Sequence, residues 1–364
     1  MELFVDIEKQ AGDFYLKSSF SIESERFALL GPSGCGKTMT LKCIAGIEKP
    51  DKGVIRLGDK VLFDSDRNIN VPSRNRHAGF LFQNYALFPD MTVRENVLIA
   101  ANDKEYALDL IERFGLNDVE ELFPHSLSGG QSQRTALARM LAAKPDILMF
   151  DEPFSALDNY LAMRMERELL EILEKFEGPS ILVTHDRNEA YRLADKIAAM
   201  ESGSIVEIKE RHDFFDNPDT VTAARLTGCK NISRISKNGD GSYFAQDWGI
   251  RIVPCTDGDG PSLEDADSVG YRAHYFKFVS GGVDHNCFDC ELLRVIEDTF
   301  SVSILFRQRG NGIASDDSVL TWIADKEEWI MIRDDVMSGT FSLSVDPRKL
   351  MPLRDSNASS GYSG

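Results

Sequence analysis

The residues best suited to chemistry form a glycine-rich stretch directly after a short apolar run, 27–30, that predicts a buried strand. The stretch reads Gly31-Pro32-Ser33-Gly34-Cys35-Gly36-Lys37-Thr38. Glycines in this pattern let backbone amides close around phosphate oxygens, and a helix that starts here adds its positive end. We predict that Lys37 neutralises the β- and γ-phosphates of a nucleotide and that Thr38 ligates Mg²⁺. The alternative is a simple glycine-rich turn.

Two carboxylates follow a second apolar run, 147–150, at the expected edge of the same sheet. Asp151 is predicted to orient a hydrated Mg²⁺. Because strand alternation points Glu152 elsewhere, it is free to act as general base toward a water in line with the γ-phosphate. The alternative is a strand end carrying two solvated acids.

A second glycine-rich helix start, Ser128-Gly129-Gly130-Gln131, precedes a predicted helix over 129–143. It also faces amides and a positive helix end toward an anion. One chain cannot easily place two helix N-termini on one γ-phosphate. We therefore predict a homodimer in which each start is supplied by a different subunit. The alternative is a glycine cap on an ordinary helix.

With Leu127 before it, this segment reads LSGGQ, and together with the two nucleotide motifs it resembles the ABC ATPase family. The resemblance covers roughly residues 1–225. It implies ATP and Mg²⁺ as cofactors and ATP hydrolysis as the activity. It also implies that Gln83 contacts the metal, that Asp158 belongs to a loop at the dimer interface, and that His185 is a switch residue beside Glu152. A histidine that follows a buried strand could hydrogen-bond the γ-phosphate or hold Glu152 and water.

The later part of the chain resembles the accessory domain of importer ATPases. Segments 88–93, 226–231 and 269–274 look most like molybdate or sulfate importers, while tungstate, ferric iron and polyamine systems share the architecture. The resemblance implies two transmembrane permease subunits and an extracytoplasmic solute-binding protein as partners. The alternatives are a soluble ABC ATPase that acts on a macromolecule, which the single cassette disfavours, and a P-loop kinase, which the LSGGQ segment disfavours.

Apolar runs alternate with helical patterns as far as about residue 225, which is typical of an α/β fold. Strands are predicted at 27–30, 77–82, 147–150 and 180–184. Helices are predicted at 37–47, 129–143, 159–176 and 187–194. From about residue 231, short strand-like runs broken by turns such as Gly239-Asp240-Gly241 predict a small β-barrel or sandwich. The predicted organisation is therefore an ABC ATPase domain over 1–228, with a mainly parallel sheet and a helical subdomain, a β-rich domain over 229–354, and a disordered tail over 355–364.

Composition sets limits on location and partners. The chain has 364 residues, of which 42% are hydrophobic, enough for two domains. A formal net charge of −18 disfavours a broad surface for nucleic-acid phosphates, so we expect no nucleic-acid partner. Because we find no apolar stretch near the roughly 18 residues of a membrane span and no secretory signal, we expect a peripheral protein on the cytoplasmic side of the membrane, soluble when isolated.

Three further features leave alternatives open. Ala11 stands where relatives carry an adenine-stacking aromatic, so Phe14 or Tyr15 is a candidate for that contact. Cys35, at a helix start beside Lys37, is predicted either to have a pKa below that of a free cysteine or to be an inert filler.

Cys287 and Cys290 form a C-x-x-C motif after His285, but no second pair exists at zinc-ribbon spacing, so ordinary strand cysteines are expected. Finally, the segment 83–91 contains more apolar residues than a free surface loop needs, namely Tyr85, Leu87, Phe88 and Met91. It is predicted to dock a cytoplasmic helix of the membrane partner or, alternatively, to pack on itself.

Overall fold

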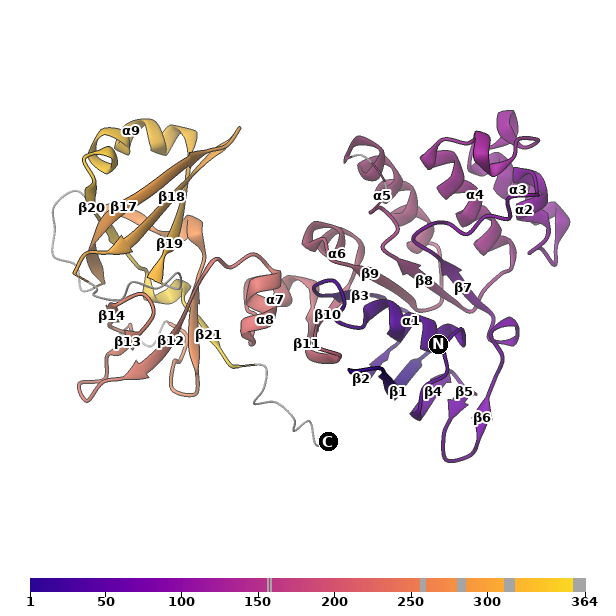
Figure 1. Ribbon diagram of the computed structural model, residues 1–364, viewed down its shortest axis with the longest axis horizontal. Helices are drawn as coiled ribbons and strands as arrows, with labels where there is room; N and C mark the ends of the chain where they lie inside the picture. The colour runs from indigo at the N-terminus through magenta and orange to yellow at the C-terminus, as the bar shows by residue number, and fades with distance from the viewer. Residues whose placement is uncertain (156, 158, 256–259, 280–285, 311–317, 356–364) are drawn as a thin grey trace. The chain divides into compact units, whose positions relative to one another are not determined.

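The computed structural model describes residues 1–155, 157, 159–255, 260–279, 286–310 and 318–355. The chain divides into two compact units, Met1–His212 and Asp213–Gly364, each of which is described by itself (Figure 1). The division after residue 228 stays a prediction. The predicted tail lies outside the described residues from 356 onward, as does His285.

An eleven-stranded sheet is the framework of the first unit, in the order β6-β5-β4-β1-β2-β11-β10-β3-β9-β8-β7. Its strands are β1 (Leu3–Ala11), β2 (Phe14–Ile22), β3 (Arg26–Leu30), β4 (Lys52–Leu57), β5 (Lys60–Asp64), β6 (Ile69–Asn70), β7 (Ala78–Leu81), β8 (Ile147–Asp151), β9 (Ser180–Thr184), β10 (Lys196–Glu201) and β11 (Ser204–Glu210). From β10 to β7 all neighbours are parallel, whereas β1, β2, β4, β5 and β6 pair antiparallel. The α/β class is confirmed, but the sheet is mixed rather than mainly parallel, because tight turns join the strands of its other half.

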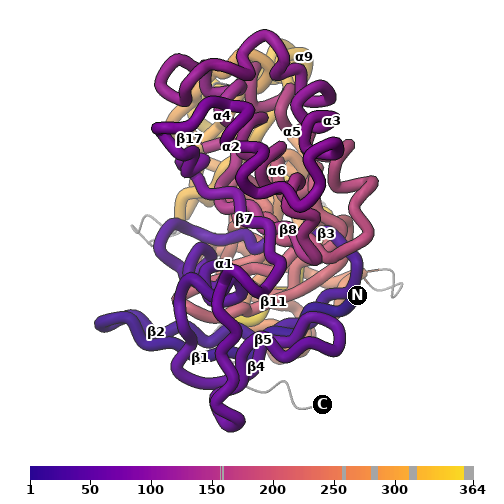
Figure 2. The backbone as a smooth tube through the Cα atoms, turned by 90° about the vertical axis from the view of Figure 1, so that its right-hand side faces the viewer, coloured from indigo at the N-terminus to yellow at the C-terminus, as the bar shows by residue number. Residues whose placement is uncertain are grey.

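Six helices of the first unit accompany this sheet. They are α1 (Lys37–Ala45), α2 (Val93–Leu98), α3 (Lys104–Arg113), α4 (Gly129–Ala142), α5 (Asn159–Leu173) and α6 (Arg187–Leu193). Helices α2, α3 and α4 share a small apolar core of their own, which includes Val93, Leu110 and Ala138. Figures 1 and 2 both place these helices on one side of β7 and β8, with β1, β2, β4 and β5 on the other. A helical subdomain is therefore present, as predicted.

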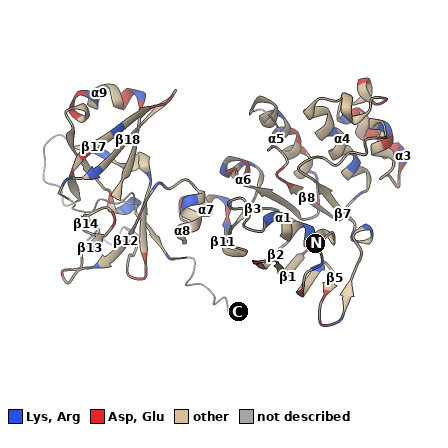
Figure 3. Cartoon of the chain, in the orientation of Figure 1, with Lys and Arg blue, Asp and Glu red and all other residues tan. Residues whose placement is uncertain are grey.

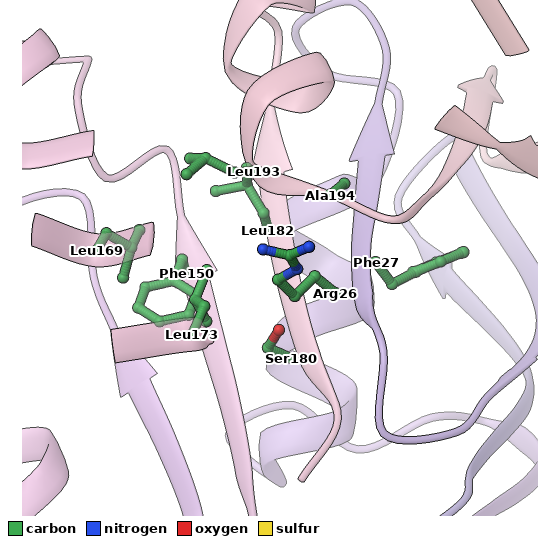
Figure 4. A pocket seen from close by; sticks show the side chains of 9 residues that line it. All are labelled: Arg26, Phe27, Phe150, Leu169, Leu173, Ser180, Leu182, Leu193 and Ala194. Atoms are coloured by element: carbon green, nitrogen blue, oxygen red, sulfur yellow. The ribbon is translucent and has the colours of Figure 1, made fainter. Parts of the chain in front are cut away.

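The central strands are apolar because both of their faces are covered. Every residue of β8 and β9 is buried, which is the pattern expected for the middle of a parallel sheet. Figure 4 shows how Leu169 and Leu173 of α5 and Leu193 of α6 surround a void beside Phe150 and Leu182. The void measures about 10 Å³, which is at most the space of one water molecule. It is a packing defect rather than a binding site.

The second unit contains two antiparallel sheets that face a common apolar core. Their orders are β14-β13-β12-β15-β21 and β16-β20-β17-β18-β19. The strands are β12 (Asn231–Lys237), β13 (Tyr243–Ala245), β14 (Ile250–Ile252), β15 (Ser268–Tyr271), β16 (Lys277–Val279), β17 (Cys287–Glu297), β18 (Ser301–Gln308), β19 (Leu320–Asp325), β20 (Thr340–Ser344) and β21 (Met351–Leu353). Trp248, Trp322 and Phe276 are among the largest side chains of the shared core. The predicted β-rich architecture is confirmed.

Short helices complete the second unit. Helix α7 (Arg211–Asp216) spans the division between the units, α8 (Val221–Leu226) follows it, and α9 (Lys326–Met337) lies between β19 and β20. The chain turns between β12 and β13 where Gly239-Asp240-Gly241 predicted a turn, and Asn238 N donates to Ser242 O across it at 2.8 Å. The segment 226–231 packs beside 269–274, because Asn231 pairs with Tyr271 in adjacent strands.

The two C-x-x-C cysteines lie in one strand, as expected. Cys290 is fully buried, and Cys287 is partly exposed. Because side chains alternate along a strand, residues three apart point to opposite faces. This placement does not support a shared metal or a disulfide between them.

Lysine and arginine are interspersed with aspartate and glutamate along both units (Figure 3). Among the described residues, no helix is long and apolar enough to cross a membrane.

Candidate nucleotide site

The glycine-rich loop connects β3 to α1, as predicted. Gly36 caps the helix in a left-handed conformation with φ 108°. A Cβ at this position would lie 2.9 Å from Leu16 and 3.1 Å from the ring of Phe14, so only glycine fits. The loop is thus held against the sheet directly before the start of α1, and a glycine-rich loop at a helix start is the arrangement that binds phosphate.

Lys37 and Thr38 lie at the first turn of α1. Lys37 is 4% exposed, and its ammonium donates to the carbonyl oxygens of Gly31 at 2.7 Å and Pro32 at 2.9 Å. These contacts hold the ammonium over the loop, where a phosphate would compete with the two carbonyls for it. Lys37 is therefore placed to neutralise a phosphate bound by the loop.

The Thr38 hydroxyl donates to Asp151 Oδ1 at 2.7 Å. This hydrogen bond joins the glycine-rich loop 31–38, called the P-loop below, to the end of β8. Burial raises the pKa of the Asp151 carboxyl, although the Thr38 hydrogen bond opposes the shift. A hydroxyl and a carboxylate oxygen at this separation form a donor set that suits Mg²⁺, a cation that prefers oxygen ligands. The residues present therefore fit the predicted metal.

Glu152 and His185 meet at the same sheet edge, at the ends of β8 and β9. His185 Nδ1 lies 3.3 Å from Glu152 Oε1. Glu152 adopts φ 46°, which is uncommon for a residue with a side chain, while its N–H donates to Val183 O at 2.9 Å. Strained backbone of this kind concentrates at functional sites. Thus Asp151 faces Thr38 while Glu152 faces His185, and the two acids have different environments.

Gln83 follows β7 and reaches the segment after Glu152. Its Nε2 donates to Ser155 Oγ at 3.1 Å, and Ser155 Oγ donates to Glu152 O at 3.0 Å. This contact brings Gln83 to the neighbourhood of the acids, while its role as a metal ligand stays a prediction. Asp158 lies outside the described residues.

The glycine-rich start of α4 stands apart from the P-loop. Ser128 Oγ accepts from Gln131 N at 3.3 Å, and Gln131 Oε1 accepts from Ser128 N at 2.8 Å, which is a capping box. Ser128 and Gly129 are exposed, and Gly130 is buried near Leu161. In the part of the chain that the structure describes, no hydrogen bond joins this start to Lys37, Thr38 or the two acids. The capped helix end is open to another molecule.

Phe14 and Tyr15 take different positions on β2. Phe14 packs against the P-loop at Gly36, whereas Tyr15 is 47% exposed on the other face of the strand. Phe14 is therefore the aromatic that borders the phosphate loop.

The hypothesis of an acidic thiol at Cys35 is wrong. Burial raises the pKa of the Cys35 thiol, and the neighbouring Lys37 charge only partly offsets this effect. The side chain is 4% exposed. The interpretation of Cys35 as an inert filler of a tight loop fits these observations.

Sequence reasoning did not single out Glu189, which supports the segment around His185. Its carboxylate accepts from the Thr184 hydroxyl at 2.5 Å, and Asp186 caps the same helix by accepting from Asn188 N. Burial raises the pKa of Glu189 to about 7, with Asp186 and Glu166 raising it further and the Thr184 hydrogen bond and His185 opposing. The sequence did contain a signal for Glu189, because it is an acid in the first turn of the helix that follows His185.

This pKa predicts a pH-dependent stability. Because the folded pKa exceeds the ordinary 4.5, the folded chain binds more protons than the unfolded chain between pH 4.5 and 7, so stability falls as pH rises through this window. With partial exposure taken into account, we expect a loss of about 2 kcal/mol, which Glu189→Gln should abolish. Urea unfolding at pH 5 and pH 8 measures it, with Glu105→Gln, the first-turn acid of α3, as the control. Equal pH dependence of the wild type and Glu189→Gln would contradict it.

Comparison with known proteins agrees with this geometry. Residues 17–155 match the family model described as ABC transporter. The Fe(3+) ions import ATP-binding protein of Haemophilus influenzae is 39% identical over 219 residues, which are 58% of this chain and 61% of the relative. The sulfate/thiosulfate import ATP-binding protein of Rhizobium meliloti is 36% identical over 274 residues, 72% of this chain and 75% of that protein. This chain belongs to the ABC transporter ATP-binding proteins.

Further relatives of this ABC ATP-binding protein differ in what their names say they import. The trehalose/maltose import ATP-binding protein of Thermococcus litoralis is 37% identical over 69% of this chain and 71% of its own length. A solved dimeric ATP-binding cassette bound to ADP and Pi covers 58% of this chain at 26% identity, with a TM-score of 0.49. These relatives are named as ATP-binding proteins of importers, and the chain spans about three fifths of the length of the first ferric iron relatives it matches.

Proposed function

We propose that this chain binds ATP with Mg²⁺ at two composite sites of a homodimer and hydrolyses it to energise a membrane importer. The observation that carries the proposal is the convergence of Thr38, Asp151, Glu152 and His185 beside the P-loop. The capped start of α4 remains open, as a residue set contributed to the other subunit's nucleotide would be. Each site would combine Lys37 and its neighbours of one chain with residues 128–131 of the other.

Each residue of the site has its own role in ATP hydrolysis. The loop amides and Lys37 bind the phosphates, and Thr38 and Asp151 hold Mg²⁺, which balances phosphate charge. Glu152 accepts a proton from the attacking water, and His185, 3.3 Å from Glu152, fixes the carboxylate and reaches toward the γ-phosphate. Because ATP is bound between two chains, binding favours the closed dimer and hydrolysis reopens it.

The proposed solute is an oxyanion such as molybdate or sulfate. The sulfate alignment spans 274 residues and 72% of the chain, so it extends into the second unit, whereas the ferric iron alignment spans 219 residues and 58% of the chain. The sugar alignment is also long, at 263 residues, so solute choice needs its own test. The segments 226–231 and 269–274, which carried the sequence resemblance, form a structural network in which Asn231 Nδ2 donates to Tyr271 O at 3.1 Å.

Reconstitution tests both parts of the proposal. This chain is assembled in proteoliposomes with the two permease subunits and the solute-binding protein that co-purify with it. ATP hydrolysis and uptake are then measured with molybdate, sulfate, ferric iron, putrescine and maltose. We expect one oxyanion to stimulate both rates. If only ferric iron, putrescine or maltose stimulates the two rates, the oxyanion proposal is wrong. If the assembled complex does not hydrolyse ATP, the ATPase proposal is wrong.

We further propose that the membrane partner docks on the segment 83–91, through its residues 85–91. Phe88 is 46% exposed, and Leu87 and Met91 are partly exposed, although Tyr85, predicted to join them, is buried at 8%. Tyr85 turns inward because the backbone reverses there. The remaining apolar side chains form a small exposed patch, the usual mark of an interface.

Disulfide cross-linking tests this docking. In a Cys255→Ser/Cys287→Ser background, Leu87→Cys is paired with cysteines placed along the cytoplasmic loops of the permease, and Leu108→Cys on the exposed face of α3 is the matched control. We expect an adduct from Leu87→Cys that changes in yield with nucleotide. If position 87 yields no more adduct than position 108 in any nucleotide state, the docking proposal is wrong.

A further inference from the structure

Arg139 of α4 lies outside the nucleotide site, yet it holds the backbone of the docking segment 85–91. Its guanidinium donates to Tyr85 O at 2.9 Å and to Ala86 O at 2.8 Å. The Phe88 ring lies over the same guanidinium, with the ring centre 5.2 Å from its central carbon. One side chain of α4 therefore contacts three successive parts of the segment.

The backbone that Arg139 holds is strained. Tyr85 has φ 60° and Ala86 has φ 44°, so two consecutive residues with side chains occupy the left-handed region. Such conformations are sterically disfavoured and persist only where surrounding contacts impose them. Two charge-assisted hydrogen bonds to the carbonyl groups of these two residues are contacts of that kind.

The far end of the segment is fixed by α2. Asn96 is fully buried, and its amide donates to Phe88 O at 3.1 Å and to Met91 O at 3.0 Å, while its oxygen accepts from Phe88 N at 2.9 Å. Helices α2 and α4 belong to the same apolar core. Both anchors of the docking segment are thus in the helical subdomain.

An open cleft lies between the helical subdomain and α5. It has a volume of about 580 Å³ and is lined by both apolar and charged side chains, such as Leu141, Ile172 and Glu168. Gln83, by contrast, bonds to Ser155 next to the catalytic acid. The chain therefore passes from the nucleotide site to the helical subdomain between Gln83 and Tyr85.

We infer that Arg139 is a positioning residue that makes the docking segment and α4 move together as one rigid body. Movement of the docking segment by the membrane partner then moves residues 128–131, about 16 Å away at the other end of α4, relative to the nucleotide of the opposite subunit. The inference rests on the proposed function. By linkage, closure of the dimer on ATP acts back on the partner through the same residue.

The experiment measures how strongly solute stimulates ATP hydrolysis in the reconstituted complex, relative to hydrolysis by the isolated chain. Arg139→Lys keeps the charge but removes the two-pronged guanidinium. We expect it to retain wild-type hydrolysis when isolated and wild-type cross-linking at Leu87→Cys, while stimulation falls about tenfold, as for loss of a typical coupling. Arg113→Lys, on the exposed face of α3, is the control and should behave as wild type.

A second variant acts on the backbone alone. Ala86→Gly leaves the Arg139 side chain unchanged but widens the range of backbone conformations open to residue 86, so the docking segment can move independently of α4 and stimulation should fall. Asn68→Gly relieves the same kind of conformation, φ 53°, in the turn between β5 and β6, and it should have no effect. If Arg139→Lys does not fold, the comparison of Ala86→Gly with Asn68→Gly still tests whether the docking segment and α4 move together.

Three results would contradict this role of Arg139. They are wild-type stimulation in folded Arg139→Lys, wild-type stimulation in Ala86→Gly, or an equal fall in the ATP hydrolysis rates of the isolated chain and of the stimulated complex. The last would place Arg139 in hydrolysis or general stability instead. Failure of the proposed function is distinguishable, because it would show as a lack of solute-stimulated hydrolysis in the wild-type complex.

Discussion

Glu152→Gln is expected to reduce ATP hydrolysis by about 10²- to 10⁴-fold, the contribution typical of a positioned general base. The amide keeps the shape of the side chain but cannot accept the proton of the attacking water. Binding should persist, because Lys37, Thr38 and Asp151 are untouched and Asp151 bonds Thr38 independently of Glu152. The variant should therefore accumulate in an ATP-bound form.

The measurement is steady-state phosphate release by the reconstituted complex, together with equilibrium binding of labelled ATP. Glu177→Gln, an exposed acid before β9, is the matched control and should hydrolyse as wild type. Near wild-type turnover in Glu152→Gln would remove Glu152 from the role of base. Loss of binding together with hydrolysis would assign it to nucleotide affinity instead.

Activity should survive when Lys37→Ala and Ser128→Arg are placed on opposite chains of a dimer, and should be largely lost when both are placed on one chain beside a wild-type chain. If each site combines the P-loop of one chain with residues 128–131 of the other, the first arrangement puts both defects in one site and leaves the second intact. The other arrangement gives each site one defect. Self-contained sites predict the reverse.

Differently tagged chains, co-expressed and purified by both tags, provide the two mixed dimers. The opposite-chain dimer should retain up to about half of wild-type hydrolysis, and each homodimeric variant should lose most of it, because positioned charge contributes strongly to phosphoryl transfer. Ser128→Arg removes a helix cap and adds a cation at the positive end of α4, so its melting temperature must be measured alongside. Greater activity in the same-chain arrangement would contradict composite sites.

Central parts of this fold were predictable because burial fixes their composition. The strands β3, β8 and β9 are continuous apolar runs, since helices cover both faces of that part of the sheet. Helix α4 was found from its glycine-rich start. Its predicted end, residue 143, differs by one from the observed Ala142.

Other elements were missed because their signals are weaker or were not used. Strand β2 alternates buried and exposed residues and contains serines and a lysine, so it lacks an apolar run. Helix α9 buries Trp329, Ile332 and Val336 at helical spacing, but it lies among short strands. Strand order cannot be read from local pattern at all, which is why a mainly parallel sheet was expected.

The site was predicted as a set of residues but not as a geometry. The motifs identify Thr38 and Asp151 separately, whereas the 2.7 Å contact between them depends on β3 and β8 flanking β9. For Cys35, two opposing effects were known, but only the structure shows that burial outweighs the lysine charge. Tyr85 was expected on the surface because the reversal at residues 85 and 86 has no glycine to announce it.

The central claim is that two chains enclose two ATP molecules, and the stoichiometry of Glu152→Gln tests it most directly. The purified variant is incubated with Mg²⁺ and ATP, its mass is measured by light scattering during size exclusion, and the nucleotide in the peak is quantified. We expect a dimer that carries two unhydrolysed ATP molecules, and a monomer when ADP replaces ATP or when Ser128→Arg is added. A monomer that binds ATP as tightly as the dimer, or a dimer indifferent to nucleotide, would contradict it.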